Sequence, residues 1–284
     1  MSAQILDGKS LAKEVRAGLK IRVDALRAKG VVPRLDVLVA IQDPASLAYV
    51  QMKRRWADEI GMIGESFEVS ESTTQSELIA KIDELNTNPN VHGVLIQHPL
   101  PKHLDEPAAL ERLGHEKDVD GITPQSLGRL VSGLDGFRCA TPLGMMKMLD
   151  RYQIECKGKR ALVIGRSVIL GKPAALMLLE RDATVTIAHR YTQNLAELCS
   201  QADILVAAVG KAELVKGSWL KPGCVVLDAG YNKVEGRSHD VGDVEFEEAA
   251  KVASFITPVP GGVGPMTVAS LLSNCVEAAE KSLT

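Results

Sequence analysis

The sequence predicts an α/β protein of two domains with mainly parallel sheets. Three observations support this prediction. The 284 residues are enough for two domains that each bury a core. Residues 160–173 have the pattern of a buried strand, a tight turn and a helix, and three further apolar runs of strand length follow them. The first half of the chain carries its own alternation of helical and strand patterns, which indicates a second sheet.

The composition is that of an ordinary globular protein, with 45% hydrophobic and 24% charged residues. A net charge of -3 argues against a dedicated nucleic-acid-binding protein, which normally carries a basic face. No apolar run approaches the roughly 18 residues of a membrane span, and the first residues lack the basic and apolar regions of a signal peptide. We therefore expect a cytoplasmic protein with neither a membrane nor a nucleic acid as partner.

Helix and strand patterns alternate through the first half. Thr74 and Glu77 form a capping box at the start of the third predicted helix. A second parallel sheet is expected from this alternation. The predicted elements are a helix over residues 11–29, a strand over 34–41, a helix over 46–60, a strand over 65–69, a helix after Thr74 and a strand over 91–97.

A boundary between the domains is expected near residue 140. Gly133 and Gly136 mark a turn, and a helix starts at Thr141 and Pro142. We assign residues 1–140 to the first domain and 141–266 to the second. The apolar spacing of residues 267–279 predicts a last helix, which allows residues 267–284 to return and pack on the first domain.

The segment 160–173 is the strongest local signal in the second half. An apolar run ends at Gly165, and a helix with Pro173 in its first turn follows Gly171. The free N–H groups of such a helix start favour an anion such as a phosphate. A P-loop is excluded because five residues separate the glycines and Pro173 follows Lys172 where Ser or Thr is needed. The match to a dinucleotide-binding turn is partial, and any strand leading into a helix in an α/β protein remains an alternative.

The predicted strands 183–188, 204–210 and 224–230 complete a dinucleotide-binding pattern. A site for NAD usually has an acidic residue at the carboxyl end of the second strand, where it binds the ribose hydroxyls. His189 and Arg190 stand there instead, and Asp182 lies before the strand. Because Arg166 and Arg190 offer positive charge, the pattern favours NADP.

Several polar residues of the first half stand where packing does not require them. Tyr49 and Lys53 lie four residues apart on one helix face, and Gln97 ends an apolar strand. Asp118 and Asp120 lie in a turn before Gly121. Each also has a purely structural explanation: a solvated helix face, a cap at a strand end and an Asx turn.

Residues 257–267 are rich in proline and glycine, which together specify one backbone path that can bring main chain close to a ligand. An ordinary surface loop is the alternative. We expect no metal site: the five cysteines lie far apart and suit a buried apolar role, and no third ligand completes a set with His98 and His103.

Five motifs follow one another along nearly the whole chain: residues 49–53, 93–97 with 99–101, 117–121, 165–167 with 171–173, and 258–267. Together they resemble the family of bifunctional methylenetetrahydrofolate dehydrogenase/cyclohydrolase (FolD) proteins. The resemblance implies a Rossmann-type NADP domain after an α/β catalytic domain, a cleft between them, and a homodimer formed through the NADP domain. It also implies NADP-dependent oxidation of 5,10-methylenetetrahydrofolate to the methenyl cation, then hydrolysis to 10-formyltetrahydrofolate.

The resemblance also implies roles for single residues. Lys53, hydrogen-bonded to Gln97, would be the central catalytic group, with a pKa lowered by the desolvated site and the cationic substrate. Tyr49 would stack on the aminobenzoyl ring and orient Lys53, and Asp120 would bind the N–H groups of the pterin. The remaining expected contacts are Pro99, Leu100, Pro260, Gly261 and Gly262 with the folate, and Gly165, Arg166, Ser167, Gly171 and Arg190 with NADP.

The sequence departs from the family pattern in places. His98 stands where Leu is common, residues 122–125 differ, and Arg190 replaces a Ser that contacts the 2′-phosphate. Three alternatives stay open: a dehydrogenase without cyclohydrolase activity, which would not need Lys53; another two-domain NAD(P) dehydrogenase; and a non-enzymatic nucleotide-binding module.

Overall fold

The computed structural model describes residues 2–40, 44–237 and 239–283, with the side chains of residues 44–50 excluded. The chain divides into two compact units. Unit 1 comprises Met1–Lys13 and Thr141–Val268, and unit 2 comprises Glu14–Ala140 and Ala269–Thr284. Each unit contains a parallel sheet with helices, so the predicted α/β class is confirmed.

Unit 1 is built on a six-stranded sheet in the order β1-β9-β8-β7-β5-β6, and each pair of neighbours is parallel. Ile164, the last residue of β5, is in register with Ala188 at the end of β6 and Ala207 at the end of β7. The three segments that follow these strands therefore start at one edge of the sheet, as in dinucleotide-binding folds. The strands are β1 (Gln4–Ile5), β5 (Arg160–Ile164), β6 (Thr184–Ala188), β7 (Ile204–Ala207), β8 (Val225–Asp228) and β9 (Phe255–Ile256).

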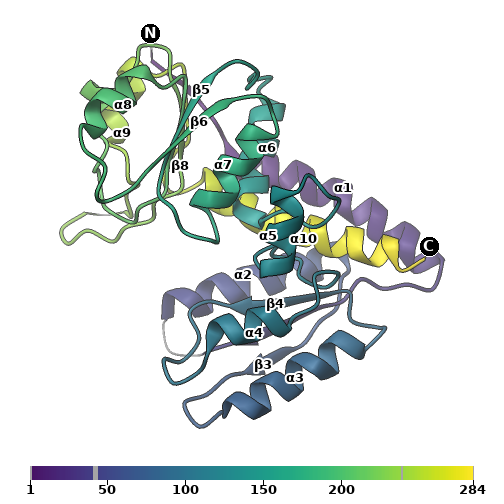
Figure 1. Cartoon of the computed structure of the whole chain (residues 1–284). Coiled ribbons are helices and arrows are strands. Elements are labelled where there is room, and N and C mark those ends of the chain that lie inside the picture. The colour runs from purple at the N-terminus through teal and green to yellow at the C-terminus, as the bar shows by residue number, and fades with distance from the viewer. Residues whose placement is uncertain (1, 41–43, 238, 284) are drawn as a thin grey trace. The chain divides into compact units, whose positions relative to one another are not determined.

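Helices cover both faces of this sheet. In Figure 1, α8 and α9 lie on one face and α7 on the other. Residues of α8 and α9, such as Cys199 and Ala249, share a buried cluster with Leu162, Leu205 and Val226 of the strands. The helices of unit 1 are α6 (Ala140–Arg151), α7 (Gly171–Leu179), α8 (Leu195–Gln201), the 3-10 turn η1 (Gly217–Trp219), α9 (Phe246–Val252) and the start of α10 (Val263–Lys281).

Unit 2 contains a three-stranded parallel sheet in the order β3-β2-β4. Leu38, Val94 and Ile96 of the strands share a buried cluster with Ile82 of α3 and Ala109 of α4. The predicted capping box is present, because Thr74 accepts from the Glu77 N–H and the Glu77 carboxylate accepts from the Thr74 N–H. The elements are α1 (Gly8–Ala28, which starts in unit 1), β2 (Leu35–Val39), α2 (Pro44–Ile60), β3 (Ser66–Glu68), α3 (Gln75–Thr87), β4 (Gly93–Gln97), α4 (Glu106–Arg112) and α5 (Pro124–Val131).

The last helix returns to the first half of the chain, as predicted. Glu280 of α10 forms a two-pronged ion pair with Arg22 of α1. Asn274 donates from its side-chain amide to the backbone oxygens of Val119 and Arg138. These contacts fix the second half of α10 within unit 2.

The start of α10 was predicted four residues too late. The helix begins at Val263 rather than Thr267, so it takes in the end of the proline-glycine segment. Pro265 lies in the first helical turn, where a backbone N–H has no intrahelical partner to lose. Strands β1 and β9, of two residues each, were not predicted.

Candidate functional site

A buried lysine lies at the carboxyl end of the sheet of unit 2. Lys53 is on α2 and is only 6% exposed. Its Nζ donates a hydrogen bond of 2.8 Å to Oε1 of Gln97, the last residue of β4. The Gln97 amide nitrogen donates to the backbone oxygen of His98 at 3.1 Å, which turns the amide oxygen toward Lys53. The structure thus brings together two of the predicted site residues.

The surroundings of Lys53 lower the pKa of its ammonium group. Burial lowers the pKa of the Lys53 ammonium, because the charged form loses its hydration. The carboxylate of Asp120 opposes this effect and favours the charged form. Burial likewise raises the pKa of Asp120, and Lys53 opposes that shift. Lys53 and Asp120 therefore interact as opposite charges in a poorly hydrated place.

The two aspartates of the turn have different tasks. Asp118 is buried, and its carboxylate accepts from the backbone N–H groups of Gly121 at 2.9 Å and Thr123 at 2.8 Å. Asp118 therefore makes the Asx-type turn that was considered for Asp120. Gly121 has φ +69°, and a side chain there would collide with the backbone of Arg138. The carboxylate of the half-buried Asp120 is not used in this turn, so it remains available to a ligand.

The remaining residues predicted to contact the folate have different surroundings. The bonds before Pro99 and Pro260 are cis. Pro99 is exposed, while the Leu100 side chain is buried in the cluster of α3 and α4. Tyr49 belongs to α2, but its side chain lies outside the described residues.

The predicted dinucleotide turn joins β5 to α7 in unit 1. Gly165 has φ +135°, and a Cβ there would lie 2.3 Å from the backbone oxygen of Ala208. A Cβ at Gly171 would lie 2.3 Å from the backbone oxygen of Gly165. Both positions therefore require glycine, because the turn passes against the end of β7 and then against itself. Ser167 Oγ accepts from the Gly171 N–H at 3.3 Å, and the Leu170 side chain does not cap the helix.

Two arginines follow neighbouring strands at this edge of the sheet. The Arg190 guanidinium lies 4.6 Å from the ring centroid of Tyr191, and that of Arg166 lies 6.0 Å from it. All three residues are exposed. Positive charge therefore gathers where a dinucleotide fold places the ribose of the adenosine half, and the residues present fit a 2′-phosphate.

The segment 258–262 approaches main chain of unit 1 itself. The Lys9 N–H donates to the Gly261 oxygen at 2.9 Å, and the Gly262 N–H donates to the Pro258 oxygen at 2.9 Å. A Cβ at Gly8 would lie 1.8 Å from the Gly262 oxygen. Close packing at the start of α1 accounts for part of the glycine content of this segment.

Two polar groups escaped the sequence analysis. Asp228 ends β8, and its carboxylate accepts from the N–H groups of Gly230, Asp243 and Val244. Burial raises the pKa of Asp228 to about 7 against these hydrogen bonds. An acidic residue at the end of an apolar strand was the available signal. The other is the carboxylate of Glu106, whose Oε1 lies 2.8 Å from the ring Nδ1 of His98, a residue that the sequence marked only as a departure from the family pattern.

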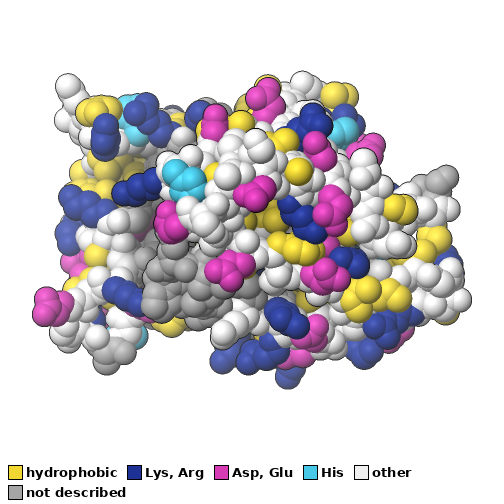
Figure 2. Space-filling view, turned by 90° about the horizontal axis from the view of Figure 1, so that it is seen from below, with side chains coloured by type: hydrophobic (Ala, Val, Ile, Leu, Met, Phe, Trp, Pro, Cys, Tyr) yellow, Lys and Arg dark blue, Asp and Glu magenta, His cyan; other side chains and the backbone are white. Residues whose placement is uncertain are grey.

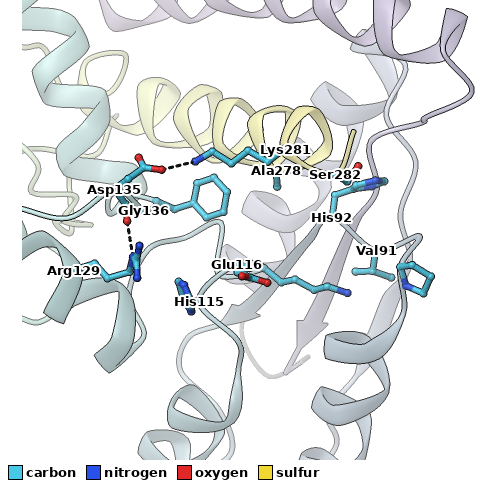
Figure 3. Close-up of a pocket in the computed structure, with 13 residues that line it drawn as sticks. Val91, His92, His115, Glu116, Arg129, Asp135, Gly136, Ala278, Lys281 and Ser282 are labelled. Carbon is cyan, nitrogen blue, oxygen red and sulfur yellow. Dashed lines mark hydrogen bonds and ion pairs between the residues drawn. The ribbon is translucent and has the colours of Figure 1, made fainter. Parts of the chain in front are cut away.

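A cavity of about 480 Å³ lies at the opposite end of β4 and is lined by residues such as His92, Arg129 and Lys281 (Figure 3). Lys281 pairs with Asp135, and Arg129 donates to the Asp135 backbone oxygen. Because these groups satisfy one another and the Lys53 cluster lies elsewhere, we do not assign the candidate site to this cavity.

Basic and acidic side chains are interspersed on the face drawn in Figure 2. Within the described ranges no three His, Cys, Asp or Glu side chains are placed to hold a metal. The described part of the chain also contains no helix that is long and apolar enough to cross a membrane.

Comparisons with known proteins agree on one family. Residues 6–120 match the model described as "Tetrahydrofolate dehydrogenase/cyclohydrolase, catalytic domain", and residues 139–283 match the corresponding "NAD(P)-binding domain". The "Bifunctional protein FolD" of Moorella thermoacetica is 52% identical over 281 residues, which are 99% of this chain and 100% of that protein.

Solved structures agree. The bifunctional FolD methylenetetrahydrofolate dehydrogenase/cyclohydrolase of Campylobacter jejuni is 43% identical, with a TM-score of 0.96 and coverage of 99% of both chains. The Trypanosoma brucei methylenetetrahydrofolate dehydrogenase-cyclohydrolase, solved with NADP cofactor and inhibitor, is 36% identical, with a TM-score of 0.95 and coverage of 100% of this chain and 99% of that one.

Proposed function

Since this chain belongs to the tetrahydrofolate dehydrogenase/cyclohydrolase family, we propose that Lys53, Gln97 and Asp120 carry its folate chemistry and that the Gly165 turn binds its cofactor. The protein is a bifunctional enzyme. It oxidises 5,10-methylenetetrahydrofolate with NADP and hydrolyses the methenyl product to 10-formyltetrahydrofolate. The observation that carries the residue assignment is the hydrogen bond from the buried Lys53 ammonium to Gln97, next to the charge of Asp120.

The cyclohydrolase step needs a group that takes a proton from water. Water adds to the methenyl carbon, forming a C–O bond as one of its protons passes to Lys53. The C–N bond to N5 then breaks as N5 takes a proton, and the remaining hydroxyl proton leaves to solvent as the formyl C=O forms. Lys53 suits both transfers, because burial makes its neutral form accessible and a cationic substrate favours it further. Gln97 keeps the Lys53 nitrogen in place through its amide oxygen.

Asp120 supplies an acceptor for the N–H groups of the pterin. A carboxylate accepts from two donors at once, which matches the amino group and the neighbouring ring N–H of a pterin. Its charge also offsets the positive charge of the methenyl product. We propose further contacts of the folate with Tyr49, Pro99, Leu100, Pro260, Gly261 and Gly262.

The dehydrogenase step asks for binding rather than acid–base chemistry. NADP, when bound, supplies the acceptor for the hydride that leaves the methylene carbon. The N–H groups of Gly171 and Lys172 are bonded to Ser167, so α7 is expected to attract a pyrophosphate through the positive end of its dipole rather than through free N–H groups. Arg166 and Arg190 suit the 2′-phosphate. Ser167 holds the turn by accepting from the Gly171 N–H.

We also propose that the enzyme is a homodimer formed through unit 1. Strand β6 is the edge of the six-stranded sheet, and Leu179 and Ile187 beside or on it are 57% and 44% exposed. An open edge with exposed apolar side chains suits pairing with a second copy. Light scattering after gel filtration tests this: the wild type should have twice the chain mass of 30.5 kDa, and Ile187→Glu should shift it toward the monomer.

A cytoplasmic location is proposed as well. The five cysteines are buried free thiols, as expected in a reducing compartment. Fractionation of cells that express the protein tests this proposal.

One spectroscopic assay tests the function. Enzyme is mixed with 5,10-methylenetetrahydrofolate and NADP, and the absorbance of NADPH and of the methenyl product is followed. NADPH should form, and the methenyl signal should pass through a maximum as hydrolysis proceeds. No absorbance change would favour a nucleotide-binding module, and a methenyl signal that only accumulates would favour a dehydrogenase without cyclohydrolase activity.

A further inference from the structure

His98, the residue that follows Gln97, forms a polar pair with Glu106. His98 Nδ1 lies 2.8 Å from Glu106 Oε1, and the side chains are 19% and 31% exposed. Glu106 stands in the first turn of α4, and its other carboxylate oxygen accepts from the Leu100 N–H at 2.8 Å. Both oxygens of Glu106 therefore hold the segment 98–100, and one of them fixes the orientation of the imidazole.

The other ring nitrogen of His98, Nε2, has no hydrogen-bond partner in the described part of the chain. Among the described residues, only His98 Nε2 and Ser270 Oγ are buried side-chain polar atoms without a hydrogen-bond partner. Buried polar atoms are nearly always satisfied in folded proteins, so an exception calls for an explanation, and a ligand that completes the hydrogen bond is one. When Nδ1 donates to Glu106, the neutral ring presents Nε2 as an acceptor.

Two observations locate this ring with respect to the folate groups. The His98 backbone oxygen accepts the amide hydrogen of Gln97, so the residue is adjacent to the catalytic contact. When protonated, the His98 ring also lowers the pKa of Asp120. The ring is therefore within electrostatic reach of the proposed pterin acceptor.

We propose that His98, held by Glu106, is a further substrate-positioning residue whose Nε2 accepts a hydrogen bond from an N–H group of the pterin beside Asp120. This inference rests on the proposed function of Asp120. It assigns His98 to recognition of the pterin and not to the aminobenzoyl part or to proton transfer at the methenyl carbon.

Fragment competition separates these possibilities. Inhibition of the dehydrogenase reaction is measured with 6,7-dimethyltetrahydropterin and with 4-aminobenzoylglutamate, for the wild type, His98→Leu and Glu106→Gln. We expect His98→Leu to raise the Ki of the pterin fragment about tenfold, which is the loss of one hydrogen bond, and to leave the Ki of the benzoyl fragment unchanged. The KM for methylenetetrahydrofolate should rise by a similar factor, with kcat retained. Glu106→Gln should have a smaller effect in the same direction.

His103→Leu is the matched control. Like His98, His103 lies between β4 and α4 and pairs with a glutamate, here Glu71, but its side chain is 39% exposed. It should leave both Ki values unchanged. Equal changes of both fragments in His98→Leu, or no change in either, would overturn the inference. If Asp120→Ala raises the KM for methylenetetrahydrofolate and His98→Leu does not, only this inference fails. If neither substitution changes the KM, the proposed folate site itself fails.

Discussion

The Nζ of Lys53 lies 2.8 Å from the Oε1 of Gln97, and this contact links α2 to the end of β4. The lysine is almost fully buried, so leaving its ammonium without a partner would be costly. The Gln97 amide cannot easily turn away, because its nitrogen is bound to the His98 oxygen. The sheet edge thus holds an amine in a fixed place where its pKa is lowered.

Replacing Lys53 should separate the two activities. In Lys53→Met we expect cyclohydrolase activity to fall by at least about 100-fold, the usual contribution of a general acid–base group, while dehydrogenase activity stays measurable. Hydrolysis of added methenyltetrahydrofolate and NADPH formation are measured separately. Lys20→Met, which changes an exposed lysine paired with Asp24, is the control. Retained hydrolysis in Lys53→Met would contradict the role given to this residue.

The pH dependence of hydrolysis should follow the neutral amine. Because only the deprotonated form of Lys53 accepts a proton, the cyclohydrolase kcat should rise with pH through the Lys53 pKa, which lies below its usual value. Asp120 raises that pKa, so Asp120→Asn should move the rising limb to lower pH. Rate profiles of both proteins at saturating substrate check the sign. A shift to higher pH would exclude direct coupling of the two groups.

The two neighbouring aspartates should respond differently to substitution. Asp120→Ala should raise the KM for methylenetetrahydrofolate about 10- to 100-fold, as expected for hydrogen bonds to a charged group, and reduce both activities without loss of stability. Asp118→Ala removes the acceptor of two buried N–H groups and should instead lower the melting temperature. Kinetics and thermal unfolding of both variants decide. Unchanged kinetics for Asp120→Ala would remove it from the site.

Local pattern was enough to predict most elements. The apolar run before Gly165 and the capping box at Thr74 each fall within one element, so the chain nearby determines them. The strand β1 was missed because two residues are too few to show a hydrophobic periodicity, and its partner β9 lies some 250 residues away in the sequence. The start of α10 was misplaced because Pro265 is a breaker inside a helix but is tolerated in the first turn.

The site was predictable only in part. Gln97 stands out because it ends an apolar strand, and Lys53, in the middle of α2, was indicated by its four-residue spacing from Tyr49 and by the resemblance to the family. Sequence could not decide which aspartate makes the turn, since both precede Gly121 and only the structure assigns the N–H groups to Asp118. The pairing of His98 with Glu106 depends on where α4 starts relative to the end of β4, which no local spacing encodes.

Cofactor preference should depend on Arg190. Removing its guanidinium in Arg190→Ala should raise the KM for NADP about 10- to 100-fold and leave that for NAD nearly unchanged, because only NADP carries a 2′-phosphate. Arg160→Ala is the control, since Arg160 begins β5 at the opposite end of the same sheet. Steady-state kinetics with both cofactors test this. A wild type that prefers NAD, or an equal loss for both cofactors, would overturn the assignment.

The last prediction concerns the turn itself. A methyl group at Gly165 would lie 2.3 Å from the Ala208 backbone oxygen. The backbone there has φ +135°, a conformation that residues with a side chain rarely adopt. Gly158 also has a positive φ, +71°, but has open space around its Cβ position. Gly158→Ala should therefore cost only the conformational strain, about 1 kcal/mol of unfolding free energy, whereas Gly165→Ala adds an overpacking cost of about 1–3 kcal/mol. Denaturant unfolding gives both values, and NADP titration should show weaker binding for Gly165→Ala alone. Equal costs would mean that the backbone at Ala208, just after β7, can move aside and that glycine is not required at position 165.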